Sequence, residues 1–307
     1  MKPAACLSAI LVCILTLLTT RPAAGEEIVL RPRYRPGDTY RLSLTVITET
    51  EATSTDQAGK SVSESVRLHY QASVLVLEVD DAGRPIRERH QSPSLTFERP
   101  GESGSLFKEG VAYEVHRKDA ITLVAGERRL DAKLERIVGE VLEKQFEHTL
   151  EPALVEPGHP VEAGESWPLD ESLTRRFLLS RGMRVLELGD PATATLQHAS
   201  GAGGSSEWVI DYRIPITRFE LTRMPPQAEA ARSEARLEGQ IRLPSGAPGA
   251  ADARRAPAST VSRLTLRMSG LSGGVAQRQP WSLRSTISVE GSSMGARDVS
   301  VSDATAP

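Results

Sequence analysis

The sequence predicts a mainly β (α+β) fold in which a large curved antiparallel sheet, or a partial barrel, packs on one long amphipathic helix. Apolar and polar residues alternate with a period of two over most of the 307 residues, which is typical of strands with one buried and one wet face. One central segment follows helical spacing instead. With 39% hydrophobic residues, a chain of this length can bury a core without disulfides.

The first 25 residues have the organisation of a secretory signal peptide. Lys2 is followed by an apolar run over residues 4–18, and small residues precede a cleavage site between Gly25 and Glu26. We therefore expect an exported protein, periplasmic or extracellular. The alternative is an uncleaved N-terminal anchor, although the apolar run is shorter than the roughly 20 residues that a helix needs to cross a bilayer.

Cleavage at this site would leave a chain without reactive thiols. Cys6 and Cys13 are the two cysteines, and both lie in the signal segment, so we expect no disulfides and no thiolate metal site. Loss of Lys2 and Arg21 leaves 35 of 37 basic residues against 40 acidic ones. An acidic balance of this kind argues against nucleic acid as a partner.

The region 26–151 is expected to form the N-terminal β region. Period-two alternation predicts strands over 40–46, 66–79, 85–97, 111–115 and 121–125. The sequence Asp80-Asp81-Ala82-Gly83 predicts a turn after the second strand.

This region is expected to end in a long helix over about 129–150. Its apolar stripe includes Leu134, Ile137, Val141, Leu142 and Phe146. These five side chains would pack on the sheet, and they are also the candidates for lining an apolar ligand cavity. Simple core packing is the alternative for the stripe.

Strands return in the C-terminal β region, 152–290. A shorter helix is expected first, from an N-cap at Asp170 through Ser180, ended by Gly182. Alternation then predicts strands over 208–216, 237–243, 264–268 and 281–289, followed by a polar tail over 291–307. Both regions are expected to share one sheet system. Two lobes divided near 151–160, where several prolines gather, are the alternative.

Catalytic motifs in the chain are better explained by turns. Two segments fit G-x-S-x-G, at Gly270–Gly274 and Gly291–Gly295, but no histidine follows either serine, as the triad order of that hydrolase fold requires. The pair Ser105 and Lys108 fits S-x-x-K, yet its companion S-D-N motif needs asparagine, which the chain lacks. The six histidines show no metal-ligand spacing. We therefore predict no catalytic residues, no metal and no cofactor.

Two short motifs carry a family resemblance. They are Pro36-Gly37-Asp38-Thr39-Tyr40 and Val161-Glu162-Ala163-Gly164-Glu165-Ser166-Trp167. In each, glycine makes a turn and an aromatic residue anchors the strand that follows. In these motifs the chain resembles an uncharacterised group of bacterial secreted β-rich proteins. The resemblance implies export and a non-catalytic character.

The expected function is therefore that of an exported non-enzymatic β-rich protein. Its partner would be an apolar small molecule or an envelope protein, and contact with the membrane would be confined to export. One alternative is a structural or protein-interaction module without a ligand. Another is a hydrolase that uses scattered carboxylates such as Glu165 or Asp211. The sequence does not predict the oligomeric state or the identity of the ligand.

Overall fold

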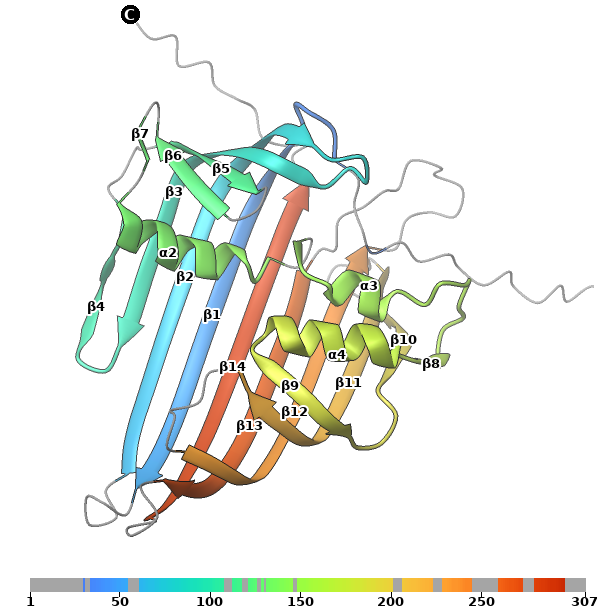
Figure 1. Ribbon diagram of the computed structural model, residues 1–307. Coiled ribbons are helices and arrows are strands. Elements are labelled where there is room, and N and C mark those ends of the chain that lie inside the picture. Colours follow the sequence, from blue (N-terminus) through green and yellow to red (C-terminus); the bar gives the residue numbers. More distant parts are fainter. Residues whose placement is uncertain are drawn as a thin grey trace, which may run out of the picture.

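In a computed structural model, the described part of the chain forms a long, curved, antiparallel sheet with three short helices on one side (Figure 1). The structure describes residues 30, 34–54, 61–107, 112–117, 121–125, 128–129, 131–145, 148–200, 206–222, 228–244, 259–272 and 279–295. The predicted signal segment lies outside these ranges, as do residues 296–307 of the predicted polar tail. Residues 291–295 of that tail belong to the last described strand.

The strands form one continuous sheet. Their bounds are β1 (Thr39–Ser54), β2 (Ser61–Val79), β3 (Pro85–Arg99), β4 (Glu102–Ser105), β5 (Tyr113–Arg117), β6 (Ile121–Ala125), β7 (Arg128–Arg129), β8 (Ser166–Pro168), β9 (Met183–Leu188), β10 (Thr193–Ser200), β11 (Ser206–Leu221), β12 (Ala228–Pro244), β13 (Ser259–Ser272) and β14 (Gln279–Gly295). The order is β7-β6-β5-β3-β2-β1-β14-β13-β12-β11-β10-β8, with β4 added to β3 and β9 added to β11. The end strands β7 and β8 do not pair in the described part of the chain, so the sheet is not closed into a barrel.

The first and last strands lie side by side at the centre of the sheet. β1 pairs with β14 from Tyr40 opposite Gly295 to Ser54 opposite Trp281. This pairing joins the N-terminal strands to the C-terminal strands. Residues directly opposite each other on paired strands point to the same face, so the register assigns each side chain to one of the two faces.

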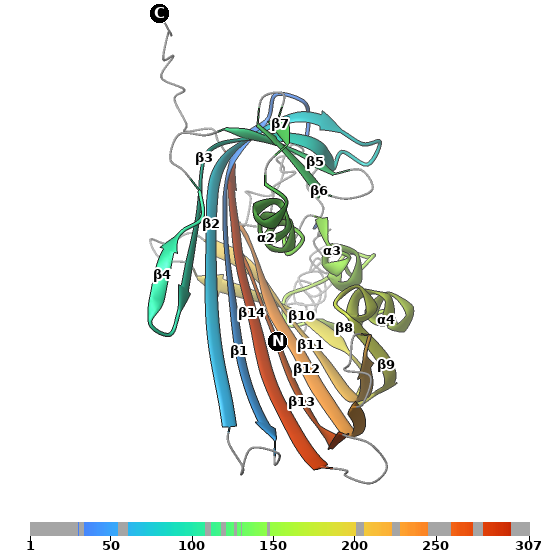
Figure 2. The same cartoon turned by 60° about the vertical axis from the view of Figure 1, so that its left-hand side comes forward.

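The helices α2 (Ala132–Leu142), α3 (Glu151–Val155) and α4 (Glu171–Ser180) all lie on one side of the sheet, which we call the inner face (Figure 2). We call the opposite side the outer face. Among the described residues, the inner face carries two separate hydrophobic cores. The N-terminal core joins α2 to β1, β2, β3, β5 and β6. The C-terminal core joins α3 and α4 to β8–β13.

The prediction of a single long helix over about 129–150 is wrong. The helix spans only Ala132–Leu142, with Asp131 as its N-cap. After it the chain tightens, because the amide N–H of Lys144 donates to Val141 O and that of Gln145 donates to Leu142 O, each three residues back. The Gln145 side chain is buried among polar groups of the sheet, and this anchor replaces a further helical turn.

Other local predictions are confirmed. Helix α4 begins after Asp170, whose side chain accepts from the Leu173 amide at 2.8 Å, and it ends before Gly182 at φ +81°. Each predicted strand lies within or overlaps an observed one. The motif glycines Gly37 and Gly164 both have positive φ, and the aromatic residues after them, Tyr40 and Trp167, are buried.

Candidate functional site

Between the two cores, the inner face of β2, β1 and β14 is not crossed by a described helix over its lower half in Figure 1. The register places two rows of side chains there: Val66, Thr48 and Ile287 in one row, and Val62, Ala52 and Leu283 in the other. We call these six residues the central inner face.

The central inner face is apolar except for Thr48, and it is only partly covered. Val62 is 64% exposed, and the other five side chains are half-buried. A row of polar residues lies between the two apolar rows, with Glu64 and Ser285 on either side of Thr50. The hydroxyls of Thr50 and Ser285 lie 3.2 Å apart. An exposed valine beside half-buried aliphatic neighbours leaves apolar area that a ligand or another surface can remove from water.

Trp281 lies next to this surface on the same face of β14, opposite Ser54. Its ring packs against the C-terminal core. Its indole Nε1 is buried, and no hydrogen-bond acceptor reaches it within the described residues. A buried N–H without a partner costs about 1–3 kcal/mol, so this group can gain free energy from an acceptor supplied by a bound molecule.

A closed ring of hydrogen bonds attaches the end of α2 to the sheet. Tyr40 donates its hydroxyl to Glu88 Oε1, and Arg117 donates Nε to Glu88 Oε2 at 3.1 Å. Arg117 also donates Nη2 to Gln145 Oε1 at 2.8 Å, and Gln145 donates Nε2 back to the Tyr40 hydroxyl at 3.1 Å. Glu88 is fully buried. Burial alone would raise its pKa, but the charge of Arg117 and the neighbouring His90 hold that pKa far below the usual range.

Two histidines lie close to this ring. His90 is fully buried, its Nδ1 is 2.6 Å from the Tyr70 hydroxyl, and Tyr70 in turn bonds Tyr113. Burial lowers the pKa of His90. His148 is partly exposed as a residue, but its Nε2 is buried and has no partner among the described residues. Burial and the charge of Arg117 lower the pKa of His148 to about 3.

The C-terminal core contains a second anchor of the same type. Glu151, at the start of α3, accepts a hydrogen bond from the Tyr212 hydroxyl of β11, and its other oxygen lies 3.6 Å from Arg181 Nη2. Burial raises the pKa of Glu151, and burial together with the carboxylate raises that of Tyr212. Each core thus contains a buried carboxylate, a tyrosine and an arginine that join its helices to the sheet.

The helix residues named as ligand-facing candidates lie in or against the N-terminal core. Val141 and Leu142 are fully buried, at 1% and 0% exposed. Leu134 and Ile137 are partly buried and pack against the same core. Phe146 lies outside the described residues. None of the four described side chains belongs to the central inner face.

The carboxylates considered for a hydrolase, Glu165 and Asp211, form local hydrogen bonds in a turn and between neighbouring strands. Glu165 lies in an exposed turn, where it accepts from the Glu162 amide at 2.9 Å, and Asp211 accepts from Gln240 Nε2 at 2.9 Å. The G-x-S-x-G segment at residues 291–295 is part of strand β14. Among the described residues, no group of three or more His, Asp or Glu side chains is placed to hold a metal ion. No described helix is both long enough and apolar enough to span a bilayer.

The buried polar ring could not be predicted from the sequence. Glu88 and His90 lie in a strand where Arg87 and Arg89 alternate with them, so both faces are charged and the alternation does not say which face is inside. Trp281 was recognised as a strand residue, but its unpartnered N–H depends on neighbours that are distant in sequence.

Comparisons with known proteins show similarity at the level of solved structures alone. No protein-family model matches the chain, and no curated protein matches it. A structure of lipovitellin that concerns lipid–protein interactions is 9% identical with a TM-score of 0.35, covering 87% of this chain, which spans 26% of that one. An outer membrane channel from Pseudomonas putida F1 is 10% identical with a TM-score of 0.20, covering 86% of this chain and 98% of its own.

A LolA superfamily protein from Nitrosomonas europaea is 8% identical with a TM-score of 0.11, covering 87% of this chain and 89% of its own. At these values the likeness does not extend to residues that could share a role.

Proposed function

We propose that the chain is an exported, non-enzymatic binding protein that holds an apolar molecule on the central inner face. The observation that carries the proposal is the partly covered apolar surface between the two cores, where Val62 is 64% exposed. An exposed aliphatic side chain beside half-buried apolar neighbours on the inner side of a curved sheet is typical of sites that bind apolar ligands or other proteins.

The neighbouring polar groups favour a ligand with one polar end. The buried Trp281 N–H lacks an acceptor among the described residues, and Thr50 and Ser285 supply hydroxyls between the apolar rows. An amphipathic molecule with an ester, amide or carboxylate group would cover the aliphatic side chains and accept from the indole. The cost of the unpaired donor then becomes part of the binding free energy.

Native mass spectrometry tests this function. The protein would be exported from a bacterial host, purified without detergent and measured before and after extraction with organic solvent. We expect a reproducible added mass that extraction removes, and its value would identify the class of ligand. A bare protein mass, together with no uptake of added long-chain fatty acid, would contradict the proposal.

The same mass measurement distinguishes a ligand-binding protein from a protein-interaction module without a ligand. An interaction module would fill the same apolar surface with protein, so its added mass would be that of a polypeptide and would resist the solvent. Export and the absence of enzymatic activity belong to the proposal. They rest on the expected signal segment and on the missing companion residues of the catalytic motifs in the sequence.

A further inference from the structure

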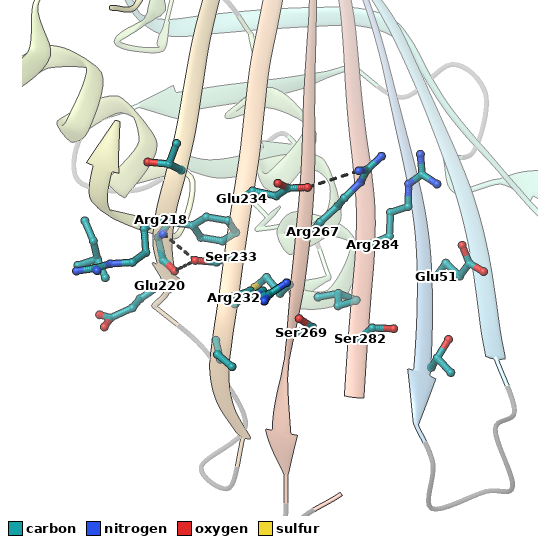
Figure 3. A pocket seen from close by; sticks show the side chains of 18 residues that line it. Glu51, Arg218, Glu220, Arg232, Ser233, Glu234, Arg267, Ser269, Ser282 and Arg284 are labelled. Atoms are coloured by element: carbon teal, nitrogen blue, oxygen red, sulfur yellow. Dashed lines mark hydrogen bonds and ion pairs between the residues drawn. The ribbon is translucent and has the colours of Figure 1, made fainter. Parts of the chain in front are cut away.

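A hollow of about 890 Å³ lies on the sheet, lined by residues of β1, β9, β11, β12, β13 and β14 and their neighbours. Figure 3 shows these strands in the opposite order across the page from Figure 1, where the helices are in front. The labelled charged side chains therefore lie on the outer face, away from the helices and from the central inner face. The hollow and the proposed apolar site lie on opposite faces of the sheet, and Leu283 is the one residue of the central inner face that also lines the hollow.

A row of four charged residues crosses the hollow. The register places Glu51 opposite Arg284, Arg284 opposite Arg267, and Arg267 opposite Glu234. Arginines that face each other on adjacent strands repel, and like charges in this position destabilise a sheet. An ion pair with Glu234 partly offsets this repulsion at Arg267, because Arg267 Nη1 lies 3.5 Å from Glu234 Oε1 (Figure 3).

The carboxylates of the hollow have partners, whereas most of its guanidinium groups have none. Glu234 pairs with Arg267, Glu220 lies 3.5 Å from Arg184 Nη1, and Glu51 accepts from the Ser61 hydroxyl at 3.4 Å. The remaining lining arginines have no ion pair or side-chain hydrogen bond within the part of the chain that the structure describes. They are Arg218, Arg232 and Arg284.

Hydroxyl groups lie in the neighbouring row. The register runs from Thr53 through Ser282 and Ser269 to Arg232 on the same outer face. Guanidinium groups beside short hydroxyl side chains supply several N–H and O–H donors. Among the described residues, Glu51 is the lining carboxylate that has a hydroxyl partner but no ion pair. This donor set matches the oxygens of a phosphate group, which arginine binds in a bidentate manner.

We propose that this hollow, which we call the arginine hollow (Arg218, Arg232, Arg267 and Arg284), binds a phosphate-bearing anion. The anion would lie between Arg284 and Arg232, accept hydrogen bonds from the intervening serine hydroxyls and offset the repulsion between Arg267 and Arg284. The phosphate could belong to a soluble organic phosphate or to a phospholipid headgroup, and both offer the same oxygens.

Two binding measurements distinguish these sources. One titrates the purified protein with glycerol 3-phosphate by calorimetry. The other follows co-sedimentation with phosphatidylglycerol vesicles, with phosphatidylcholine vesicles as the uncharged reference. Both are carried out at low and at physiological salt, because binding through exposed charges weakens as salt rises.

The test variant is Arg232→Gln with Arg284→Gln. Its matched control is Arg41→Gln with Arg213→Gln, two outer-face arginines outside the lining of the hollow that remove the same net charge. We expect the test pair to weaken binding at least about tenfold and the control pair to change it less than twofold. Glycerol phosphate binding with this dependence assigns a soluble source, and vesicle binding alone assigns a headgroup. No binding in either measurement, or equal weakening by the two pairs, would overturn the proposal.

Discussion

The ring of Tyr212 fills the space beside Gly239 that a Cβ atom on the neighbouring strand would need. The same tyrosine reaches across β12 and donates its hydroxyl to the buried Glu151 of α3. A glycine at this position of β12 therefore lets an aromatic side chain connect the sheet to a helix.

Gly239→Ala is predicted to destabilise the protein by about 1–3 kcal/mol, the usual cost of overpacking a filled core. The added methyl group would overlap the Tyr212 ring and displace its hydroxyl from Glu151. Gly139→Ala is the matched control, because its Cβ would meet no closer contact than Ile121 Cβ at 4.0 Å. In helix α2 this change should stabilise by up to about 1 kcal/mol. Urea unfolding of the two variants checks both signs, and a loss of similar size in each would contradict this account.

Glu88→Gln is predicted to cost about 3–5 kcal/mol, the range for removing one partner of a buried ion pair. The change leaves the Arg117 guanidinium, 8% exposed, without its carboxylate. Glu114→Gln removes a carboxylate that pairs with Arg87 and Arg89 at 2.9 Å on the more exposed side of the same strands. That loss should be below about 1 kcal/mol. The prediction is wrong if denaturant midpoints fall equally in the two variants.

Because the pKa values of His90 and His148 are lowered in the folded protein, we predict that the stability of the fold decreases in acid. His148 has its pKa lowered to about 3 in the folded state, against about 6.5 in the unfolded chain. The unfolded chain therefore binds the proton more readily between these values, and stability decreases as pH falls from about 6.5 towards 3, by up to about 1.4 kcal/mol per pH unit.

His148→Gln should remove this contribution and flatten the pH dependence over that window. Glu88 adds a separate loss at lower pH, because its depressed pKa stabilises the fold above about pH 4.3 and this stabilisation disappears as the pH falls towards the folded value. Thermal unfolding of both proteins at pH 7, 6, 5 and 4 gives the comparison. An unchanged slope in His148→Gln would show that the imidazole is not buried in neutral form.

The sequence was sufficient for features that depend on local chemistry. Alternation identified the long strands, and the Gly37 and Gly164 turns were recognisable because glycine tolerates positive φ. The burial of Tyr40 and Trp167 followed from the same motifs. The prediction that the helix continues beyond Leu142 was wrong, because the Gln145 side chain forms hydrogen bonds with Arg117 and Tyr40. Both partners lie far from Gln145 in the sequence.

The central inner face and the arginine hollow were beyond the sequence for a related reason. The central inner face arises where β14 pairs with β1, a contact between residues more than 200 positions apart. The arginine hollow arises from the register of strands β11 to β14. The alternation of apolar and polar residues predicts which residues of each strand share a face. It does not predict which strands are neighbours or which residues lie opposite each other. Arg267 and Arg284, for example, read as ordinary exposed arginines until the register places them opposite each other.

The most direct test of apolar binding on the inner face is a titration with cis-parinaric acid, a fatty acid that fluoresces in apolar surroundings. Val62→Asp places a charge on the central inner face at a position that is 64% exposed, so stability should change little. Val261→Asp does the same on the outer face, where the valine is 43% exposed. We expect saturable binding by the wild type and by Val261→Asp, with at least about tenfold weaker binding by Val62→Asp, since a charge is costly to bury against an acyl chain. Equal affinity for all three proteins, or no saturable binding by the wild type, would contradict the central claim.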